Sequence, residues 1–242
     1  LALSNEVMAG ELIRDDVVKF CREESLVEIP EIGRVDLTEA CDVLADWDLK
    51  SNLESRGSVL FRELLASANG PVYTRYLPES FGPALEFDVN APIETPRGLD
   101  ERARPHVIEA LAKAVHRLRE SKIPLDVELG AVQGVTRKGE RIPIHGGNEG
   151  EGVFNKIEAK FEGAAGYPDV TSWSSSWILA VEFGESGPES HGILTYSLSA
   201  NPDSPHFADQ TKMYSRKEWL DLPYRREDVE KATLRVYEVG SQ

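Results

Sequence analysis

The spacing of apolar residues changes once along the chain, and this change most constrains the fold. Up to residue 122, apolar residues recur every three or four positions, as they do along one face of a helix. From Ile123 onward, short apolar runs are separated by glycine and proline turns, which is typical of strands. The pattern predicts an α+β fold, with a helical first third, a largely antiparallel sheet and C-terminal helices. We expect residues 1–242 to form a single domain, in which residues 1–122 are mainly helical and residues 123–242 supply the strands and last helices.

Four stretches of the first part carry helical periodicity. The first begins after Asn5, a residue type that often caps helices, and the second begins after Asp36, which is also placed as a cap. A proline and glycine loop separates these two helices. Two more helices are expected around residues 59–65 and 107–121. The proline-rich segment 70–98 is too interrupted for long regular elements, so we expect it to cross the surface.

Two hairpins are expected in the second part. The shorter one turns at residues 138–139. The longer one pairs residues 177–183 with residues 193–198, and its first strand is apolar on both faces. A strand of that composition is typical of the buried centre of a sheet. Helices are then expected over residues 205–219 and 226–232.

Net charge and hydropathy limit the partners. The chain has 42 acidic and 27 basic residues, and its formal charge of -15 repels nucleic-acid phosphates and anionic lipid headgroups. No apolar run approaches the roughly 20 residues that a membrane-spanning helix needs. We therefore expect neither nucleic acid nor a membrane among the partners. Because the chain begins with Leu1 inside a helical pattern, we also expect it to be a piece cut from a longer precursor.

The stretch SANPDSPHFADQT contains the residue types of a serine hydrolase, namely Ser204, His206 and Asp209. A self-contained triad is disfavoured, because serine followed by proline is typical of a helix start. In that interpretation Ser204 is the cap and Pro205 takes the first helical position. The Ser204 hydroxyl would then bind backbone amides, and His206 and Asp209 would pair one turn apart. A supporting role of this stretch in a site built elsewhere stays open.

Two further motifs could lie near a ligand. The glycine-rich stretch 145–155 lacks the ending of a phosphate-binding loop and carries Glu149 and Glu151, which would oppose a phosphate. We expect a loop in which glycine permits close backbone approach, with a position near a ligand as the alternative. The cluster WSSSW, Trp173 to Trp177, could line an acyl pocket, although aromatic residues that lead into a buried strand are more often core.

No metal and no cofactor are expected. The histidines show neither the HExxH motif nor the cysteine–histidine spacing of a zinc site; they are His106, His116, His145, His191 and His206. Carboxylates such as Asp42, Asp46 and Asp48 are expected on a solvated helix face.

The two cysteines, Cys21 and Cys41, lie near the ends of neighbouring helical patterns. A disulfide between them would close a short loop and stabilise the fold by about 3 kcal/mol, less any strain. Two small buried thiols are the alternative.

Four long motifs together resemble one family. They are, in chain order, ACDVLADWDLKSNLESRGSVLFREL, IPIHGGNEGEGVFN, WILAVEFGESGP and LTYSLSANPDSPHFADQTKMYSRKEWLDLPY. This order is similar to that of the later part of the large β subunit of penicillin-amidase-family acylases, in the branch with acyl-homoserine-lactone acylases and aculeacin-type acylases. The proline-rich stretch 70–98 matches weakly.

The resemblance implies an N-terminal nucleophile hydrolase with an αββα sandwich. In that family the precursor cuts itself, and the new N-terminal serine of the β subunit attacks the amide with its own α-amino group as base. Backbone and asparagine donors hold the oxyanion. This chain begins with Leu1, and its matches start downstream of the nucleophile and of the oxyanion asparagine motif. No catalytic residue is therefore carried onto any position, and Ser204 and Pro205 keep their structural interpretation.

The implied function is that of a scaffold fragment in an acylase that hydrolyses the amide bond of N-acyl substrates, such as acyl-homoserine lactones, lipopeptides or β-lactam side chains. Its partners would be the rest of the β subunit, an α subunit and the small-molecule substrate. Export to the periplasm or secretion is implied too, and it favours the bridge between Cys21 and Cys41. Two alternatives remain: an autonomous scaffold or binding module, and a hydrolase that uses Ser204, His206 and Asp209. A large exposed apolar face would count against the autonomous module.

Overall fold

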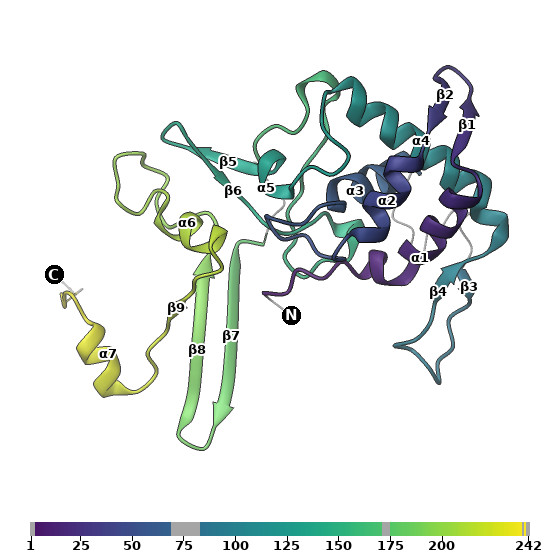
Figure 1. The fold of residues 1–242 in the computed structure, drawn as a ribbon. Coiled ribbons are helices and arrows are strands. Elements are labelled where there is room, and N and C mark those ends of the chain that lie inside the picture. Colours follow the sequence, from purple (N-terminus) through teal and green to yellow (C-terminus); the bar gives the residue numbers. More distant parts are fainter. Residues whose placement is uncertain (1–2, 69–82, 171–174, 239, 241–242) are drawn as a thin grey trace. The chain divides into compact units, whose positions relative to one another are not determined.

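The computed structural model describes residues 3–68, 83–170, 175–238 and 240. Helices and strands both contribute to the fold, and the predicted α+β class is confirmed (Figure 1). The chain divides into two compact units, Leu1–Ser174 and Ser175–Gln242, which we name the first unit and the second unit. The expectation of a single domain over residues 1–242 stays a prediction, because two compact units of one chain can belong to one larger domain.

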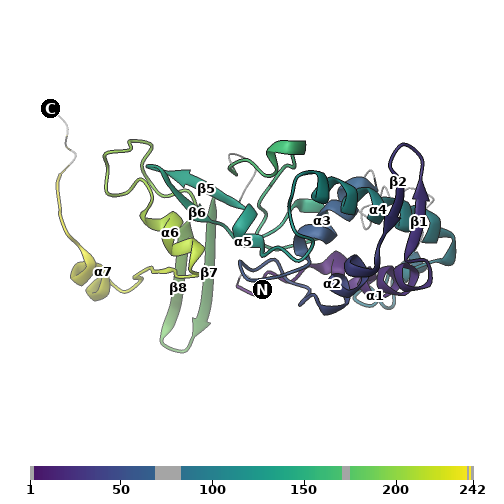
Figure 2. The same cartoon turned by 45° about the horizontal axis from the view of Figure 1, so that its top comes forward.

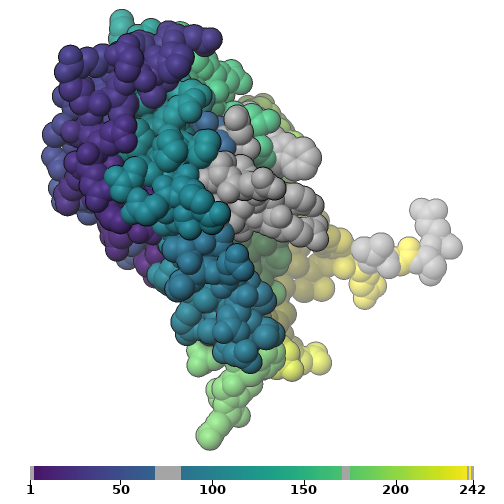
Figure 3. All heavy atoms as spheres, turned by 90° about the vertical axis from the view of Figure 1, so that its right-hand side faces the viewer, coloured from purple at the N-terminus to yellow at the C-terminus, as the bar shows by residue number. Residues whose placement is uncertain are grey.

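Four helices build the core of the first unit, and all four were expected from their apolar periodicity. They are α1 (Met8–Glu23), α2 (Thr38–Asp46), α3 (Ser58–Ser67) and α4 (Arg104–Glu120). Helix α1 packs against α2 and α4, and α3 packs against α4. Figure 2 shows these helices together, and Figure 3 shows that α4 lies beside the N-terminal segments although it is distant from them in sequence. Their inward faces are apolar, so burial of those faces holds the bundle together.

The two expected helix caps have different outcomes. Asp36 accepts a hydrogen bond from the Thr38 amide at 2.9 Å, so its side chain binds the first helical residue of α2, but Leu37 occupies the cap position that was predicted for Asp36. Hydrogen bonds from Thr38 also lower the pKa of the Asp36 carboxyl. The prediction for Asn5 was wrong, because α1 begins at Met8 with Val7 directly before it. Asn5 is buried instead, with a φ of 53°, in the left-handed region that asparagine tolerates better than most residues.

The loop expected between the first two helices contains a hairpin. Strand β1 (Leu26–Ile29) pairs antiparallel with β2 (Gly33–Asp36). Alternate residues of β1 are buried, which is the period-2 pattern of a half-covered strand. The run of four residues is too short for its periodicity to stand out beside a proline and a glycine, so the sequence pattern was interpreted as a loop.

Two further hairpins complete the strands of the first unit. Strand β3 (Pro83–Leu85) pairs with β4 (Arg97–Leu99), so the described part of the proline-rich segment holds only short elements, as expected. Strand β5 (Gly134–Arg137) pairs with β6 (Glu140–Pro143) across Lys138 and Gly139. Both turn residues have positive φ, which is the requirement of the tight turn that was predicted there.

Short helical segments join these elements. They are η2 (Glu101–Ala103), α5 (Leu129–Val132), η3 (Glu149–Glu151) and η4 (Gly163–Ala165).

A disulfide joins Cys21 of α1 to Cys41 of α2, with the two Cα atoms 5.7 Å apart. Both residues are buried. The bond links α1 to α2, which also pack against each other.

The second unit contains the longer hairpin. Strand β7 (Trp177–Gly184) pairs antiparallel with β8 (Gly187–Leu194), and the two-residue strand β9 (Leu220–Asp221) pairs with the other side of β8. Two helices follow the hairpin in sequence, α6 (Asp209–Ser215) and α7 (Arg226–Ala232). The hairpin is confirmed, and α7 has the bounds that were predicted. The returning strand ends at Leu194, earlier than the expected Leu198.

The expected burial of β7 was wrong for the described chain. Only Ile178 of this strand is buried, and β7 lies at the edge of a three-stranded sheet whose order is β7-β8-β9. A central strand needs a neighbour on each side and a layer on each face. Within the described residues, β7 has a neighbour on one side only, so an apolar composition alone did not bury it.

Candidate functional site

The polar chemistry of the first unit gathers around residues 145–155, which we name the glycine loop. Gly146 has a φ of 111°, and a Cβ atom there would lie 2.5 Å from the Asn155 carbonyl oxygen. At Gly147 a Cβ atom would lie 2.7 Å from a carboxylate oxygen of Glu151. The predicted close backbone approach is therefore confirmed. The amides of Gly146 and Gly147 donate to the carbonyls of Ser51 and Asn155, so these two amides serve the fold and do not face a phosphate.

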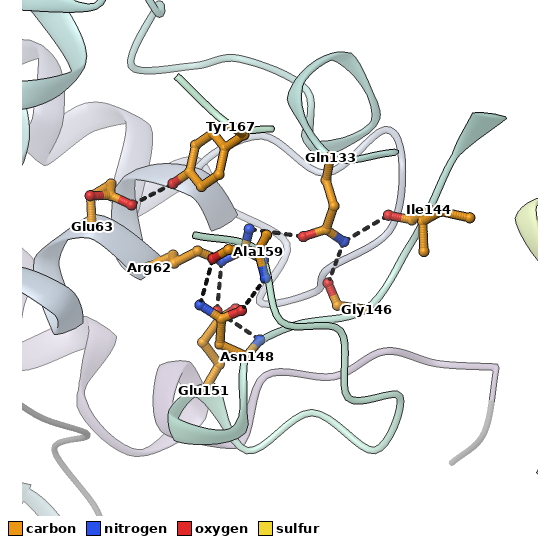
Figure 4. A network of polar contacts seen from close by, with 9 residues as sticks. All are labelled: Arg62, Glu63, Gln133, Ile144, Gly146, Asn148, Glu151, Ala159 and Tyr167. Atoms are coloured by element: carbon orange, nitrogen blue, oxygen red, sulfur yellow. Dashed lines mark hydrogen bonds and ion pairs between the residues drawn. The ribbon is translucent and has the colours of Figure 1, made fainter. Parts of the chain in front are cut away.

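A buried charge pair anchors the glycine loop to helix α3 (Figure 4). Arg62 Nε donates to Glu151 Oε1 at 2.7 Å, and both side chains are only 2% exposed. Arg62 Nη1 donates to Gln133 Oε1 at 2.9 Å. The side-chain amide nitrogen of Gln133, Nε2, in turn donates to the carbonyls of Ile144 and Gly146. Burial disfavours the charged form of Arg62 and lowers the pKa of its guanidinium. The negative charge of Glu151 outweighs this effect, so the pKa of Arg62 is raised.

Glu63, the next residue of α3, forms a second buried contact. The Tyr167 hydroxyl donates to Glu63 Oε1, and Arg117 of α4 lies 3.1 Å from Glu63 Oε2. Burial, reinforced by the negative charge of Glu63, raises the pKa of the Tyr167 hydroxyl well above its ordinary value. Tyr167 therefore stays a neutral hydrogen-bond donor, and Glu63 is shared between a hydroxyl and a guanidinium.

Asn148 ties the glycine loop to the backbone that follows it. Its backbone amide donates a hydrogen bond to Glu151 Oε1 at 3.0 Å. Its side chain exchanges two hydrogen bonds with the backbone of Ala159, as Figure 4 shows. One carboxylate oxygen of Glu151 thus receives both Arg62 and the loop backbone, which makes Glu151 the junction between α3 and the loop.

A third cluster, which we name the amide network, consists of Asn5, Asn52, His145 and Asn155. Asn5 Nδ2 donates to Asn52 Oδ1 at 2.9 Å and lies 3.0 Å from His145 Nδ1. Asn155 Nδ2 donates to Asn5 Oδ1 at 2.7 Å. All four residues are buried. The network joins the segment before α1, the segment before α3 and both ends of the glycine loop.

These groups position the backbone and are poorly suited to attack a substrate. Arg62, Glu63 and Glu151 are buried and paired, which suits a rigid scaffold, and the amide network contains no hydroxyl or thiol nucleophile. Sequence reasoning missed Asn5, Arg62, Glu63 and Gln133. The sequence held one weak signal for Arg62 and Glu63. Both charged residues lie in the apolar run of α3, and a charged side chain that is buried with such a run needs a partner.

The Ser204 stretch does not form a triad. The Ser204 Oγ accepts a hydrogen bond from the His206 backbone amide at 3.1 Å, while the His206 ring lies 2.8 Å from Asp209. The local histidine–aspartate pairing is as predicted. Partial burial raises the pKa of the Asp209 carboxyl. Hydrogen bonds from His206, the Gln210 amide and Ser197 outweigh this effect and hold that pKa below its ordinary value.

The predicted helix start at Ser204 and Pro205 needs a correction. Helix α6 begins at Asp209, with Ala208 directly before it. The Ser204 amide donates to the Asn201 carbonyl, and the Phe207 amide donates to the Ser204 carbonyl. Two successive turns therefore use the backbone before the helix begins, and the serine hydroxyl stabilises a turn where we expected a cap.

The remaining candidates are also accounted for. Trp173 lies outside the described residues, and Trp177 opens β7 and is exposed. Asp42, Asp46 and Asp48 are exposed, as expected of a solvated face. A second histidine–aspartate pair, His191 with Asp221 at 2.8 Å, lies at the surface of the second unit.

Within the described parts of the chain, no group of three or more histidine, cysteine, aspartate or glutamate side chains is arranged to hold a metal ion. No helix in those same parts is long and apolar enough to cross a membrane.

Comparison with known proteins gives a family. The family model for penicillin amidase matches residues 3–231. The chain belongs to the penicillin amidase family. Among members of this family, aculeacin-A acylase of Actinoplanes utahensis is 37% identical over 239 residues, which is 98% of this chain and 28% of that protein. Acyl-homoserine lactone acylase PvdQ of Pseudomonas savastanoi pv. phaseolicola is 32% identical over 234 residues, which is 95% of this chain and 28% of that protein.

The chain therefore spans 28% of the length of each of these two penicillin amidase family members. A solved structure of thermostable penicillin G acylase from Alcaligenes faecalis aligns with 99% of this chain and 47% of its own chain, at 15% identity and a TM-score of 0.43.

Proposed function

We propose that this chain is a structural part of a larger acylase that hydrolyses the amide bond of N-acyl substrates. One observation carries the proposal: the family model matches residues 3–231, yet the chain spans only 28% of the length of its relatives. In this proposal the chain supplies helices and strands of an αββα sandwich. The rest of the β subunit and an α subunit complete the enzyme.

The chemistry of such an enzyme needs groups that the described residues do not bring together. An N-terminal serine hydroxyl attacks the amide carbonyl while its α-amino group takes the proton. The resulting ammonium returns that proton to the amide nitrogen, which leaves the tetrahedral intermediate as the amine. Water then attacks the acyl ester, and the acid is released. Preorganised donors stabilise the oxyanion in both steps. In the described residues, neither the His206 nor the His191 ring hydrogen-bonds a serine hydroxyl, so neither pair makes a nucleophile.

The contribution of this chain is then rigidity. The buried pair Arg62–Glu151 and the amide network around Asn5 fix the glycine loop against the helical core. Such fully buried networks permit few alternative packings, which suits a part that must hold neighbouring segments in register. The exposed apolar residues of β7 count against the alternative of an autonomous scaffold or binding module.

The names of the relatives support the proposed substrate class, and the disulfide supports the proposed compartment. The named relatives act on aculeacin A and on acyl-homoserine lactones, so lipopeptides, acyl-homoserine lactones and β-lactam side chains are the proposed substrate class. Action on acyl-homoserine lactones would make the enzyme a quorum-quenching acylase. Periplasmic or secreted location fits the bond between Cys21 and Cys41, because oxidising compartments preserve disulfides.

The test compares the isolated 242-residue chain with the native protein purified from its source. Each is assayed with an N-acyl homoserine lactone and with an acylated lipopeptide, and the intact mass of every polypeptide is measured. We expect turnover by the native protein only, together with additional polypeptide mass. Turnover by the rigorously purified chain alone would overturn the proposal, and so would native protein that contains only this chain and is inactive.

A further inference from the structure

The hairpin β3–β4 and the loop between its strands carry exposed apolar side chains. We name residues 83–99 the β3–β4 arm, and Figure 1 shows the arm extending away from α1. The side chains of Leu85, Phe87, Val89 and Ile93 have exposed fractions of 55%, 62%, 76% and 85%. We name these four side chains the apolar tip. Single exposed apolar residues are common, but four on one short segment indicate an interaction surface.

Hydrogen bonds hold the loop of the arm in one shape. The Asp88 amide donates to Thr95 Oγ1 at 2.8 Å, and the Thr95 hydroxyl donates to the Ala91 carbonyl at 2.7 Å. The Asp88 carboxylate accepts hydrogen bonds from the backbone amide and the side chain of Asn90, at 2.8 Å and 3.0 Å. A loop that is already ordered loses little conformational entropy when a partner covers it. The apolar tip is therefore preorganised for binding.

The base of the arm is fastened to helix α1. Asp16 Oδ2 accepts a hydrogen bond from the Leu99 amide at 2.8 Å, and Arg97 Nη1 donates to the Glu11 carbonyl at 3.2 Å. Gly98 lies between these two contacts with a φ of 73°, and a Cβ atom there would lie 3.1 Å from Asp16 Oδ2. Glycine thus permits the close approach of the arm to the helix. The core of the first unit positions the arm, while the apolar tip lies outside that core.

Charge decides which kind of surface fits the arm. The arm carries Glu86, Asp88 and Glu94, and no lysine or arginine lies between residues 83 and 96. Anionic lipid headgroups would bring negative charge to these carboxylates, and so would a second copy of this chain, whose formal charge is -15. A protein surface with an apolar pocket and basic residues around it fits both the apolar tip and the carboxylates.

The length of the relatives gives the source of such a surface. The chain spans 28% of aculeacin-A acylase and 28% of the lactone acylase PvdQ, so most of each relative is polypeptide outside the matched region. We propose that the β3–β4 arm docks into an apolar pocket, rimmed by lysine or arginine, on the remaining polypeptide of the acylase. Phe87 and Ile93 are its anchors. The inference rests on the proposed function and goes further, because it assigns one contact to one element and states the chemistry of the surface that receives it.

Thiol labelling tests whether the arm is covered. The two cysteines of the chain are joined in the disulfide, so an introduced cysteine is the one free thiol of this chain. Ile93→Cys places it on the apolar tip, and Asp15→Cys places it on α1, where the side chain is 92% exposed. The maleimide labelling rate of each is read by mass spectrometry of its peptide, in the isolated chain and in the native protein. We expect Ile93→Cys to react about tenfold or more slowly in the native protein, and Asp15→Cys to stay within about twofold.

Each other outcome overturns a defined statement. Unchanged labelling of Ile93→Cys in a native protein that contains further polypeptide overturns the inference and leaves the proposed function standing. Equal slowing of both variants overturns the assignment of the contact to the arm. Native protein that consists of this chain alone overturns the proposed function. Labelling that slows as the concentration of the isolated chain rises overturns the choice of occupant, because it identifies a second copy.

A matched pair of phenylalanines tests the anchor. Phe87 and Phe154 are exposed to similar degrees in the first unit, 62% and 57%, and Phe87 alone lies on the arm. Expressed within the native gene, Phe87→Ala should lower the yield of assembled protein about tenfold or more, because it truncates an anchor of the contact. Phe154→Ala should stay within about twofold. The isolated Phe87→Ala chain should keep its unfolding midpoint. A shifted midpoint, or equal yields of the two variants, would overturn the role of Phe87.

A charge reversal tests the basic rim of the pocket. Glu94→Lys would bring a lysine to the proposed lysine or arginine side chains, so the yield of assembled protein should fall about fivefold or more. The control is Glu24→Lys, because Glu24 is exposed in the first unit away from the arm, and its yield should stay within about twofold. A yield of Glu94→Lys equal to that of the control would overturn the basic rim.

Discussion

The first and second units differ in where their apolar side chains lie. The first unit buries the faces of four helices around α3 and α4, whereas the buried apolar side chains of the second unit, within its described residues, are Ile178, Ile193 and Tyr214. The apolar run of β7 lies mostly at the surface. The four helices of the first unit therefore bury their own apolar faces. Within the described residues, the second unit has the apolar run of a buried strand but no layer that covers it.

The charged residues show the same contrast. The first unit buries the Arg62–Glu151 pair at 2% exposure, which a fold tolerates only when the surroundings are complete. The ion pairs of the second unit, such as Arg216 with Glu218 and His191 with Asp221, lie at its surface. Among these ion pairs, the buried one lies in the first unit, which also buries its helix faces. Five substitutions test the contrast between the two units.

The largest effect is expected from Arg62→Ala. Removal of the guanidinium leaves the Glu151 carboxylate buried without its partner, which should lower the free energy of unfolding of the first unit by about 3–5 kcal/mol. The measurement is urea unfolding followed by Trp47 fluorescence. The control is Arg56→Ala, because Arg56 pairs with Asp126 and Glu128 at the surface and should cost less than about 1 kcal/mol. Similar losses for both variants would contradict a closed first unit.

The next effect compares leucines of the two units. Leu64 of α3 is buried, so Leu64→Ala should destabilise the first unit by about 2–5 kcal/mol through lost contacts and a cavity. Leu179 of β7 is half exposed, and Leu179→Ala in the isolated chain should change stability by less than about 1 kcal/mol. The measurement is the amide exchange of each unit. If Leu179→Ala cost as much as Leu64→Ala, the Leu179 side chain of β7 would already be covered in the isolated chain.

Loss of the disulfide should have an intermediate effect confined to the first unit. Cys41→Ser releases the tie between α1 and α2 and should destabilise that unit by about 2–4 kcal/mol. The second unit contains no cysteine and serves as the internal control. The measurement is thermal unfolding with and without a reductant. A reductant that leaves the unmodified chain unchanged would contradict the bond.

A smaller effect is expected from Ser204→Ala. The change removes one acceptor for the His206 amide in a surface turn, so stability should fall by about 1 kcal/mol or less. Acylase activity of the native protein should stay unchanged, because Ser204 does not bind the His206 ring. Activity lost without a loss of stability would restore the triad of Ser204, His206 and Asp209.

The smallest effect concerns acid. The folded-state pKa of Asp209 lies below its ordinary value, so its contribution to stability is present above pH about 4 and is lost as the pH falls further. Asp209→Asn should therefore narrow the stability difference between neutral and acid pH for the second unit. The effect is small because the carboxyl is partly exposed. The measurement is the unfolding midpoint between pH 6 and pH 3, and a widened difference would contradict the sign of the shift.

Local patterns predicted much of the architecture. The periodicity of α1 and α4, the turn at Lys138 and Gly139 and the position of α7 depend on neighbours within a few residues, which is the range over which periodicity and turn chemistry act. The failures have the opposite origin. The hairpin β1–β2 is too short to show a clear period, and the start of α6 was displaced by successive turns around Ser204.

The amide network marks what local patterns could not provide. Asn5 is a plausible cap by type and position, but in the fold it meets Asn52, His145 and Asn155, which lie up to 150 positions away. Likewise, Arg62 is a charged residue on an apolar helix, and its contacts with Glu151 and Gln133 explain its presence there. Hydrogen-bond partners across such separations are decided by packing, because a buried polar group must be satisfied by whatever the fold brings near.

By itself, the sequence determined the α+β class, the main helices and hairpins, and the motifs that resemble penicillin-amidase-family acylases. The tertiary structure decided which polar residues are buried together around the glycine loop and which apolar residues remain open on β7. The physical reason is range: periodicity and turn propensity act along a few residues of chain, whereas burial is a property of what surrounds a side chain in space.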